Sequence, residues 1–213
     1  MRHSRLCQAL AAALLAAVAL ACAPAATPPA APAAAPAAAP TAATSHYALD
    51  PAKSSLEFTF LQAGAKNTGR FPRFAVTLEF PGADPAGGRL EVTVEVAALD
   101  TGDKDRDDTL RSDDLFAVAK FPKAHFLATR IVKTATGYEA DGALEIRGVT
   151  RDTKVPFTFR EATEGGVAVG YLAGKIQLRR LDFGVGQGDW KATDQLGNDV
   201  GVSFALRLSA AAH

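Results

Sequence analysis

The charged side chains best able to do chemistry are concentrated between residues 99 and 126. Carboxylates at alternating positions could ligate calcium, and two arginines close in sequence could bind an anionic head group such as a diphosphate. Both interpretations have a structural alternative, because the same charges could cap a helix and pair with one another. The residues concerned are Asp100, Asp103, Lys104, Asp105, Arg106, Asp107, Asp108, Arg111, Asp113 and Asp114.

A calcium loop is the weaker interpretation of this stretch. Asp103, Asp105 and Asp107 match the first three ligand positions of an EF-hand, and Asp114 stands at the twelfth. The sixth position, however, is Asp108 where the loop needs glycine, and the twelfth is Asp where it needs Glu. Asp105 and Asp108 are instead expected to accept hydrogen bonds at the start of a helix, where acidic residues are favourable. We therefore predict no metal site here.

The helical segment is expected to span about residues 105–119 and to end before Pro122, because proline cannot continue a helix. Within it, Arg106 and Arg111 could clamp an anionic head group, or they could belong to an internal ion-pair network that fixes the segment in place. We favour the network. The apolar residues of the segment that could face a ligand are Leu110, Leu115 and Phe116.

No other pattern in the folded part of the chain predicts catalysis or metal binding. His46, His125 and His213 are scattered without the spacing of a zinc site. There is no Gly-x-Ser-x-Gly motif for a nucleophilic serine, and both cysteines precede residue 45. The glycines of 184–188 lack the strand–turn–helix context of a nucleotide loop. We accordingly expect a protein that has no catalytic residue and no cofactor, and that is not an enzyme.

The first 44 residues predict export and a linker. Residues 1–21 combine Arg2 and Arg5 with an apolar run that ends in small residues, which is the layout of a signal peptide. Residues 22–44 are almost entirely Ala, Pro and Thr, so we expect a disordered linker. Residues 45–213 form one folded domain, whose formal charge is −2 because the whole chain is neutral and the two arginines lie outside it. Such a charge gives no support for nucleic-acid binding.

Cys22 has two interpretations. It follows Ala19-Leu20-Ala21, which resembles a bacterial lipobox, although the usual pattern has leucine where Ala19 stands. The alternative is ordinary signal cleavage with Cys22 incidental. We favour lipidation of Cys22, because the linker suits a tethered domain and several acyl chains anchor a protein stably in a membrane. In either case we expect the domain in the periplasm or cell envelope.

The folded domain shows the alternation of apolar and polar residues that is typical of strands with one solvated face. Leu56 and Phe58, for example, flank Glu57. Residues 62–69 are expected to be a loop or a short helical turn, and 179–197, rich in Gly and Asp, a longer loop. The expected strands are 54–61, 74–80, 90–96, 125–132, 138–146, 154–160, 167–178 and 198–208.

Eight alternating strands could form a sandwich or a closed antiparallel barrel. A barrel accounts better for the helical segment, which can cover one open end. We therefore predict an all-β fold, an extended eight-stranded antiparallel barrel with a short helical segment at about 105–119 over one end. The alternation does not distinguish a hollow barrel from one that side chains fill.

Several short motifs follow one another along the domain. They are Tyr47-x-Leu49-Asp50, Gly69-x-Phe71, Asp100-Thr101-Gly102, Arg106-Asp107, Leu110-Arg111-Ser112, Phe116-x3-Lys120-Phe121-Pro122-x2-His125-Phe126, Gly142-x-Leu144-x-Ile146-x-Gly148-Val149-Thr150 and Arg180-x-Asp182-Phe183-Gly184-Val185. Together they resemble the YceI-like family, polyisoprenoid-binding proteins with a lipocalin-like barrel. The resemblance covers residues 45–208, and only His125 and Leu115 depart from the residues usual in the family.

The resemblance implies a periplasmic barrel with an elongated apolar tunnel for an isoprenoid chain or a similar amphiphile, and no established catalytic residue. We therefore expect non-enzymatic binding, for storage or transport, of a long-chain apolar lipid such as a polyisoprenoid or an isoprenoid quinone. Trp190 could be a rim aromatic or part of the core. The expected ligand-binding residues are Phe58, Phe60, Phe74, Leu110, Leu115, Phe116, Phe126, Phe157, Phe183 and Trp190.

A second hypothesis belongs to another class of function. If side chains fill the barrel, the domain could be a membrane-tethered interaction module instead of a lipid carrier. Its charged segment would then bind a partner, for which a membrane redox protein is the expected type.

Overall fold

A computed structural model of the chain describes residues 44–210. The predicted signal peptide, Cys22 and almost all of the predicted linker lie outside the described residues, as does His213. Within 44–210, no helix is both long and apolar enough to cross a membrane.

The described part consists mainly of strands, with one α-helix and four 3-10 turns. The strands are β1 (Thr44–Leu49), β2 (Ser55–Gln62), β3 (Ala65–Arg70), β4 (Phe74–Pro81), β5 (Arg89–Glu95), β6 (Lys123–Thr134), β7 (Gly137–Ile146), β8 (Val149–Glu164), β9 (Val167–Arg179) and β10 (Asp199–Ala210). The helix is α1 (Lys104–Arg111), and the 3-10 turns are η1 (Pro51–Lys53), η2 (Val96–Ala98), η3 (Arg180–Phe183) and η4 (Gly188–Lys191).

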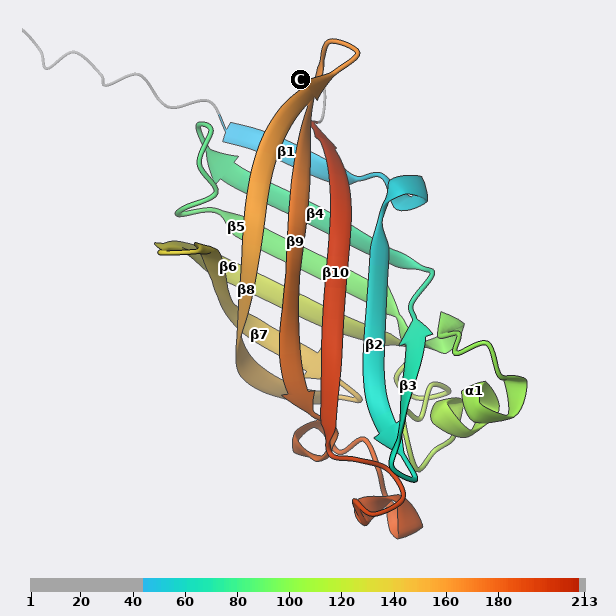
Figure 1. The fold of residues 1–213 in the computed structure, drawn as a ribbon. Coiled ribbons are helices and arrows are strands. Elements are labelled where there is room, and N and C mark those ends of the chain that lie inside the picture. The colour runs from blue at the N-terminus through green and yellow to red at the C-terminus, as the bar shows by residue number, and fades with distance from the viewer. Residues whose placement is uncertain (1–43, 211–213) are drawn as a thin grey trace, which may run out of the picture. The chain divides into compact units, whose positions relative to one another are not determined.

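Eight of these strands close into an antiparallel barrel, as predicted (Figure 1). The order around the wall is β1-β4-β5-β6-β7-β8-β9-β10, and β10 pairs back with β1. β10 also pairs with β2, because β1 and β2 follow one another along it: Leu49 lies opposite Leu208, and Phe58 lies opposite Val202. The all-β barrel that we expected from the alternating strands is therefore confirmed.

Two strands, β1 and β3, were not predicted from the sequence. β1 is short, and β3 lies where we expected a loop or helical turn. β3 pairs with β2 alone and carries no alternating apolar residues, so no periodic signal marks it. Its Gly69 allows the Phe58 ring to lie against the backbone, since a Cβ atom at this position would lie 2.3 Å from Cζ of that ring.

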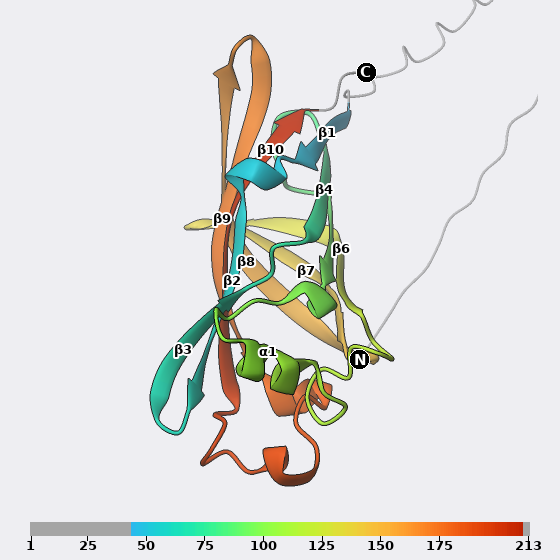
Figure 2. The same ribbon diagram turned by 90° about the vertical axis from the view of Figure 1, so that its right-hand side faces the viewer.

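Two orthogonal views show the ends of the barrel. α1 and the segment between β9 and β10 lie at one end, called the lower end here, and the turn between β8 and β9 lies at the other (Figures 1 and 2). The helix therefore lies at one end of the barrel, as predicted, although it is shorter than the expected segment 105–119.

The side chains inside the barrel form two clusters, one toward each end. The upper cluster contains a set of three rings: Tyr47 stacks on Phe80, and Phe159 packs edge-on against both. Leu78 and Leu208 in the same cluster are completely buried. The lower cluster includes Phe58, Phe60, Leu99, Leu110, Leu115, Phe183, Val185 and Leu196.

Replacement of Leu78 by alanine tests the packing of the upper cluster. Because Leu78 is fully enclosed on β4, we expect Leu78→Ala to lower the free energy of unfolding by about 2–5 kcal/mol, the range for buried leucines. Urea denaturation monitored by circular dichroism measures the change. Thr77→Ala is the control, since Thr77 is exposed on the same strand; equal effects of the two substitutions would contradict the packing described here.

Candidate ligand-binding site

The helix α1 begins at Lys104, and the residue that caps it, Asp103, precedes both acidic residues that we expected to do so. The Asp103 carboxylate accepts a hydrogen bond from the backbone N of Arg106 at 3.1 Å, so Asp103 is the N-cap. The predicted capping by Asp105 and Asp108 is wrong. Asp105 instead stands in the first turn with its side chain exposed, and Asp108 pairs with Lys104 one turn earlier.

The helix ends at Arg111 because the chain then turns back on itself. The backbone N atoms of Phe116 and Val118 donate to the carbonyl groups of Leu110 and Arg111, at 3.0 and 3.2 Å. Ala117 adopts a left-handed conformation, with φ of 49°. These bonds, which span six and seven residues, replace the expected last two turns of helix, and Leu115 lies between them inside the barrel, where it is 1 % exposed.

The segment 96–122 completes the wall of the barrel at the lower end. There β3 has no strand partner except β2. Its last residue, Arg70, instead exchanges two backbone hydrogen bonds with Asp100, at 2.8 and 3.0 Å, and their side chains form an ion pair at 2.6 Å. On the other side, the carbonyl O of Asp114 accepts hydrogen bonds from the N atoms of Gly186 and Gln187, at 3.0 and 2.7 Å.

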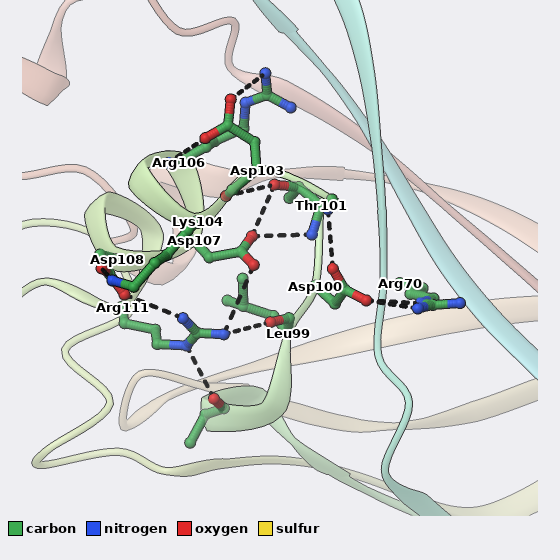
Figure 3. Close-up of polar contacts among 12 residues, drawn as sticks. Arg70, Leu99, Asp100, Thr101, Asp103, Lys104, Arg106, Asp107, Asp108 and Arg111 are labelled. Carbon is green, nitrogen blue, oxygen red and sulfur yellow. Dashed lines mark hydrogen bonds and ion pairs between the residues drawn. The ribbon is translucent and has the colours of Figure 1, made fainter.

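Most charges of this segment contact one another or the backbone (Figure 3). The buried Asp107 carboxylate accepts hydrogen bonds from the N and Oγ1 atoms of Thr101, at 2.9 and 2.7 Å. Arg111 donates to the carbonyl groups of Ala97 and Leu99, at 3.0 and 2.5 Å. These bonds bind α1 to residues 97–101, which precede it.

Hydrogen bonds and nearby cations lower the pKa of two carboxylates of this segment, Asp100 and Asp108. The amide of Gly102, and after it the guanidinium of Arg70, hold the pKa of Asp100 below its ordinary value. The ammonium of Lys104 likewise lowers the pKa of Asp108. Both effects favour the charged form, as expected for carboxylates that accept hydrogen bonds from cations.

The network agrees with the structural interpretation that we favoured for these charges. Asp103 caps the helix, Asp107 faces inward to Thr101 and Asp105 faces solvent, so the three aspartates do not converge. Residues 44–210 hold no group of three acidic, histidine or cysteine side chains placed to bind a metal ion. Arg111 is engaged by the backbone and by Asp108, which leaves no pair of arginines to clamp an anion.

An apolar cavity of about 200 Å³ lies inside the lower half of the barrel, and residues of the segment 96–122 form part of its wall. Side chains from the strands, α1 and the β9–β10 segment line it, and no polar atom faces it. Seven of the predicted ligand-binding residues are part of the lining: Phe58, Phe60, Leu110, Leu115, Phe116, Phe126 and Phe183.

The other three predicted residues lie elsewhere. Phe157 is buried in the upper cluster, and Phe74 packs against the same cluster. Neither lines the cavity. Alternation predicts only that a side chain points inward, and it does not predict how far along the barrel the side chain lies. Trp190, on η4, lines a separate cavity described below.

Two kinds of lining residue were not predicted from the sequence. The first kind points inward from strands that it did identify, and alternation alone could have found them: Leu56, Val92, Val94, Leu144, Val200 and Val202. The second kind lies in the predicted loop 179–197, where Arg180, Val185 and Leu196 carry no periodic signal.

Arg180 organises this loop from the inside. Its residue is 5 % exposed, and its guanidinium donates to the carbonyl groups of Val185, Ala192, Leu196 and Gly197 at 2.7–3.1 Å. It has no ion pair with a carboxylate of the described residues, and burial lowers the pKa of Arg180. Four carbonyl groups thus stabilise the buried charge, and they fix the residues that form one side of the cavity.

A second cavity of about 320 Å³ adjoins the first, and its walls are partly polar and partly apolar. We call it the vestibule. Four of its residues also line the apolar cavity: Phe60, Leu110, Leu115 and Leu196. The remaining lining residues are Gln62, Asp103, Asp105, Arg106, Thr109 and Trp190.

Comparison with known sequences gives a consistent result. The sequence pattern of the YceI-like domain matches residues 47–208. A UPF0312 protein of Shewanella denitrificans is 31 % identical over 146 residues, which are 65 % of this chain and 76 % of that protein. A UPF0312 protein of Photorhabdus laumondii is 34 % identical, and Protein YceI of Escherichia coli is 32 % identical; the chain spans 62 % of the length of each, and the matches cover 54 % and 55 % of this chain.

Solved structures show the same barrel. BcnA of Burkholderia cenocepacia superposes with a TM-score of 0.68 at 31 % identity, covering 75 % of this chain and 98 % of BcnA. A YCEI protein of Campylobacter jejuni gives 0.61 at 22 % identity, with 68 % and 85 % covered. A polyisoprenoid binding domain from Saccharophagus degradans gives 0.57 at 18 % identity, with 78 % and 98 % covered. The last two likenesses concern the fold alone.

Removal of the Asp107 carboxylate tests the anchoring of α1. We expect Asp107→Ala to lower the free energy of unfolding by about 1–3 kcal/mol, because the amide of Thr101 loses its acceptor in a partly buried place. Asp107→Asn keeps one acceptor oxygen and should cost less. Chemical denaturation measures both, and Asp105→Ala, at an exposed position in the same helix, is the control. A cost for Asp107→Ala no larger than that of the control would refute the anchoring role.

Replacement of Arg180 tests the organisation of the loop. In Arg180→Met four carbonyl groups lose their donor, so we expect hydrogen exchange at the amides of Gly186 and Gly197 to accelerate about tenfold or more. Exchange monitored by NMR or mass spectrometry provides the readout. The matched control is Arg179→Met, since Arg179 is exposed and adjacent in the chain. Unchanged exchange in Arg180→Met would show that the loop holds its shape without the guanidinium.

Proposed function

The chain belongs to the family of YceI-like domains, and on this premise we propose that it is a non-enzymatic binding protein for the apolar chain of a lipid. The chain of the ligand would occupy the cavity in the lower half of the barrel. A polyisoprenoid or an isoprenoid quinone is the type of ligand that we favour. The observation that carries the proposal is the cavity itself, which is lined mainly by hydrophobic side chains and exposes no polar atom.

The physical basis is the hydrophobic effect. Each 100 Å² of apolar ligand surface that leaves water contributes about 2.5 kcal/mol. A cavity that exposes no polar atom offers this gain without requiring a polar group of the protein to lose its hydration. The polyisoprenoid binding described for the Saccharophagus degradans domain, which has the same fold, adds support for a chain-like ligand.

The size of the cavity limits how much of a ligand it holds. At about 200 Å³ it is smaller than the roughly 300–1,000 Å³ of pockets that enclose drug-sized ligands. Of the buried residues of the upper cluster only Phe126 lines the cavity, so the cavity does not extend through the whole barrel in this conformation. We propose that the cavity takes one end of the chain and that a longer chain enters by displacing lining side chains such as Leu115 and Phe116.

The setting that we propose is the cell envelope. The predicted signal peptide and the predicted acylation of Cys22 would export the domain and tether it to a membrane, which is the source of lipid ligands. The alternative function, an interaction module with a filled barrel, agrees with the upper half of the barrel. The cavity in the lower half favours lipid binding.

Filling the cavity provides the test. Val202 points into the cavity from β10, whereas Ala205 is exposed on the same strand. We expect protein purified without detergent to carry a lipid that native mass spectrometry detects, or added farnesol or a short-chain quinone to raise the melting temperature. Val202→Phe should abolish both effects because it occupies ligand space, and Ala205→Phe should keep them.

Two results would contradict the proposal. One is a wild-type protein that carries no lipid and whose melting temperature does not respond to either probe. The other is a folded Val202→Phe protein that binds as the wild type does. Circular dichroism of both variants establishes that they are folded.

A further inference from the structure

The vestibule points to the kind of head group that the ligand carries. This inference rests on the proposed function, because it assumes that an apolar chain enters the neighbouring cavity. The two cavities share the side chains of Phe60, Leu110, Leu115 and Leu196, so they meet at these four residues. Since no polar atom faces the apolar cavity, a polar head group has no hydrogen-bond partner there. It therefore belongs in the vestibule, where part of the wall is polar.

The charged groups of the vestibule are Asp103, Asp105 and Arg106. Arg106 faces a carboxylate already, since its Nη2 atom lies 3.5 Å from Oδ2 of Asp103. Asp105 has no hydrogen bond or ion pair to its side chain from any described residue, and it is exposed. The vestibule thus carries a formal charge of −1, and its uncompensated charge is the carboxylate of Asp105.

The start of α1 does not supply a site for an anion. A helix N-terminus ordinarily attracts phosphate, because its free N–H groups and its dipole favour negative charge. Here Asp103 occupies the cap position, and Asp105 and Asp107 follow in the first turn. The chain's own carboxylates therefore take the place that a phosphate would need.

The other cations of the segment are engaged elsewhere. Lys104 is paired with Asp108, and Arg111 binds the carbonyl groups of Ala97 and Leu99. None of these cations lines the vestibule. Gln62 does line it, and its side-chain amide has no hydrogen-bond partner among residues 44–210. This amide can therefore both donate to a head group and accept from one.

We propose that the vestibule accepts an uncharged or cationic head group and discriminates against phosphorylated amphiphiles, with Asp105 as the residue that sets this preference. An alcohol or an ammonium group would lie beside the carboxylate of Asp105 and the amide of Gln62. A phosphate in the same place would be repelled by Asp105 and would find no free cation.

Three probes with the same chain and different head groups test this inference: dodecan-1-ol, dodecylammonium and dodecyl phosphate. Each is titrated below its aggregation concentration at pH 7 and low ionic strength, and binding is followed by calorimetry or native mass spectrometry. We expect the alcohol and the ammonium to bind the wild type at least about threefold more tightly than the phosphate. This is the effect of one unit charge at a distance of about 6 Å in water.

Asp105→Asn should reduce the ratio of the affinities for the alcohol and the phosphate, called the affinity gap here, by about threefold. Added salt should reduce this gap in the wild type, because salt screens exposed charges. Asp152→Asn is the matched control, since Asp152 is an exposed carboxylate on β8 that does not line the vestibule. This variant should leave the gap unchanged.

The outcomes separate this inference from the proposed function. If the wild type binds all three probes equally, or the phosphate most tightly, the head-group preference is refuted while lipid binding stands. A gap that Asp105→Asn leaves unchanged refutes the role of Asp105. If the wild type binds none of the three, the proposed function and this inference fail together.

Discussion

The double pairing of β10 determines the character of the whole barrel. This strand pairs with β1 toward the upper end and with β2 toward the lower end, so the wall is continuous above and interrupted below. Above, inward side chains meet across a closed ring of strands and fill it. Below, β3 has no second strand partner, and a non-strand segment must complete the wall. The apolar cavity lies in this lower half.

The segment that completes the wall is polar outside and apolar inside. The contacts of its polar side hold the apolar side in place against the interior of the barrel. Asp107 and Arg111 fix α1 to the residues before it, while Asp100 pairs with Arg70 of β3. Leu110 and Leu115 can then face the interior without a continuous strand behind them. Arg180 does the same for the opposite side of the cavity by binding four carbonyl groups of the β9–β10 segment. The charges thus stabilise the walls of a site that exposes no charge itself.

Much of this fold follows from the sequence in physical terms. The period of two in eight segments predicts an antiparallel all-β fold, because each strand must bury one face, and the helical segment at about 105–119 favours a barrel, one end of which it can cover. β3 could not be predicted, since a strand outside the closed ring buries no apolar face and leaves no alternating pattern. The length of α1 could not be predicted either, because the turn after Arg111 depends on Leu115 finding space inside the barrel.

The site was predictable in part for a related reason. Inward orientation follows from alternation, and it correctly places Phe58, Phe126 and Phe157 inside the barrel. Height along the barrel follows from register, which the sequence does not display, so Phe157 was expected at the ligand and lies in the upper cluster. Val185 and Leu196 reach the cavity from a loop whose shape depends on the buried guanidinium of Arg180, and no local pattern reveals such a long-range constraint.

The central claim is that an apolar chain occupies the lower half of the barrel and leaves the upper half filled. The most direct measurement is intermolecular NOE spectroscopy between dodecan-1-ol and the methyl groups of the labelled protein. The account predicts contacts from the alkyl chain to Leu56, Leu144 and Val202, and none to Leu78 or Leu208. Contacts confined to exposed side chains such as Leu61 and Val167, or contacts to the upper cluster without any to the lower, would contradict it.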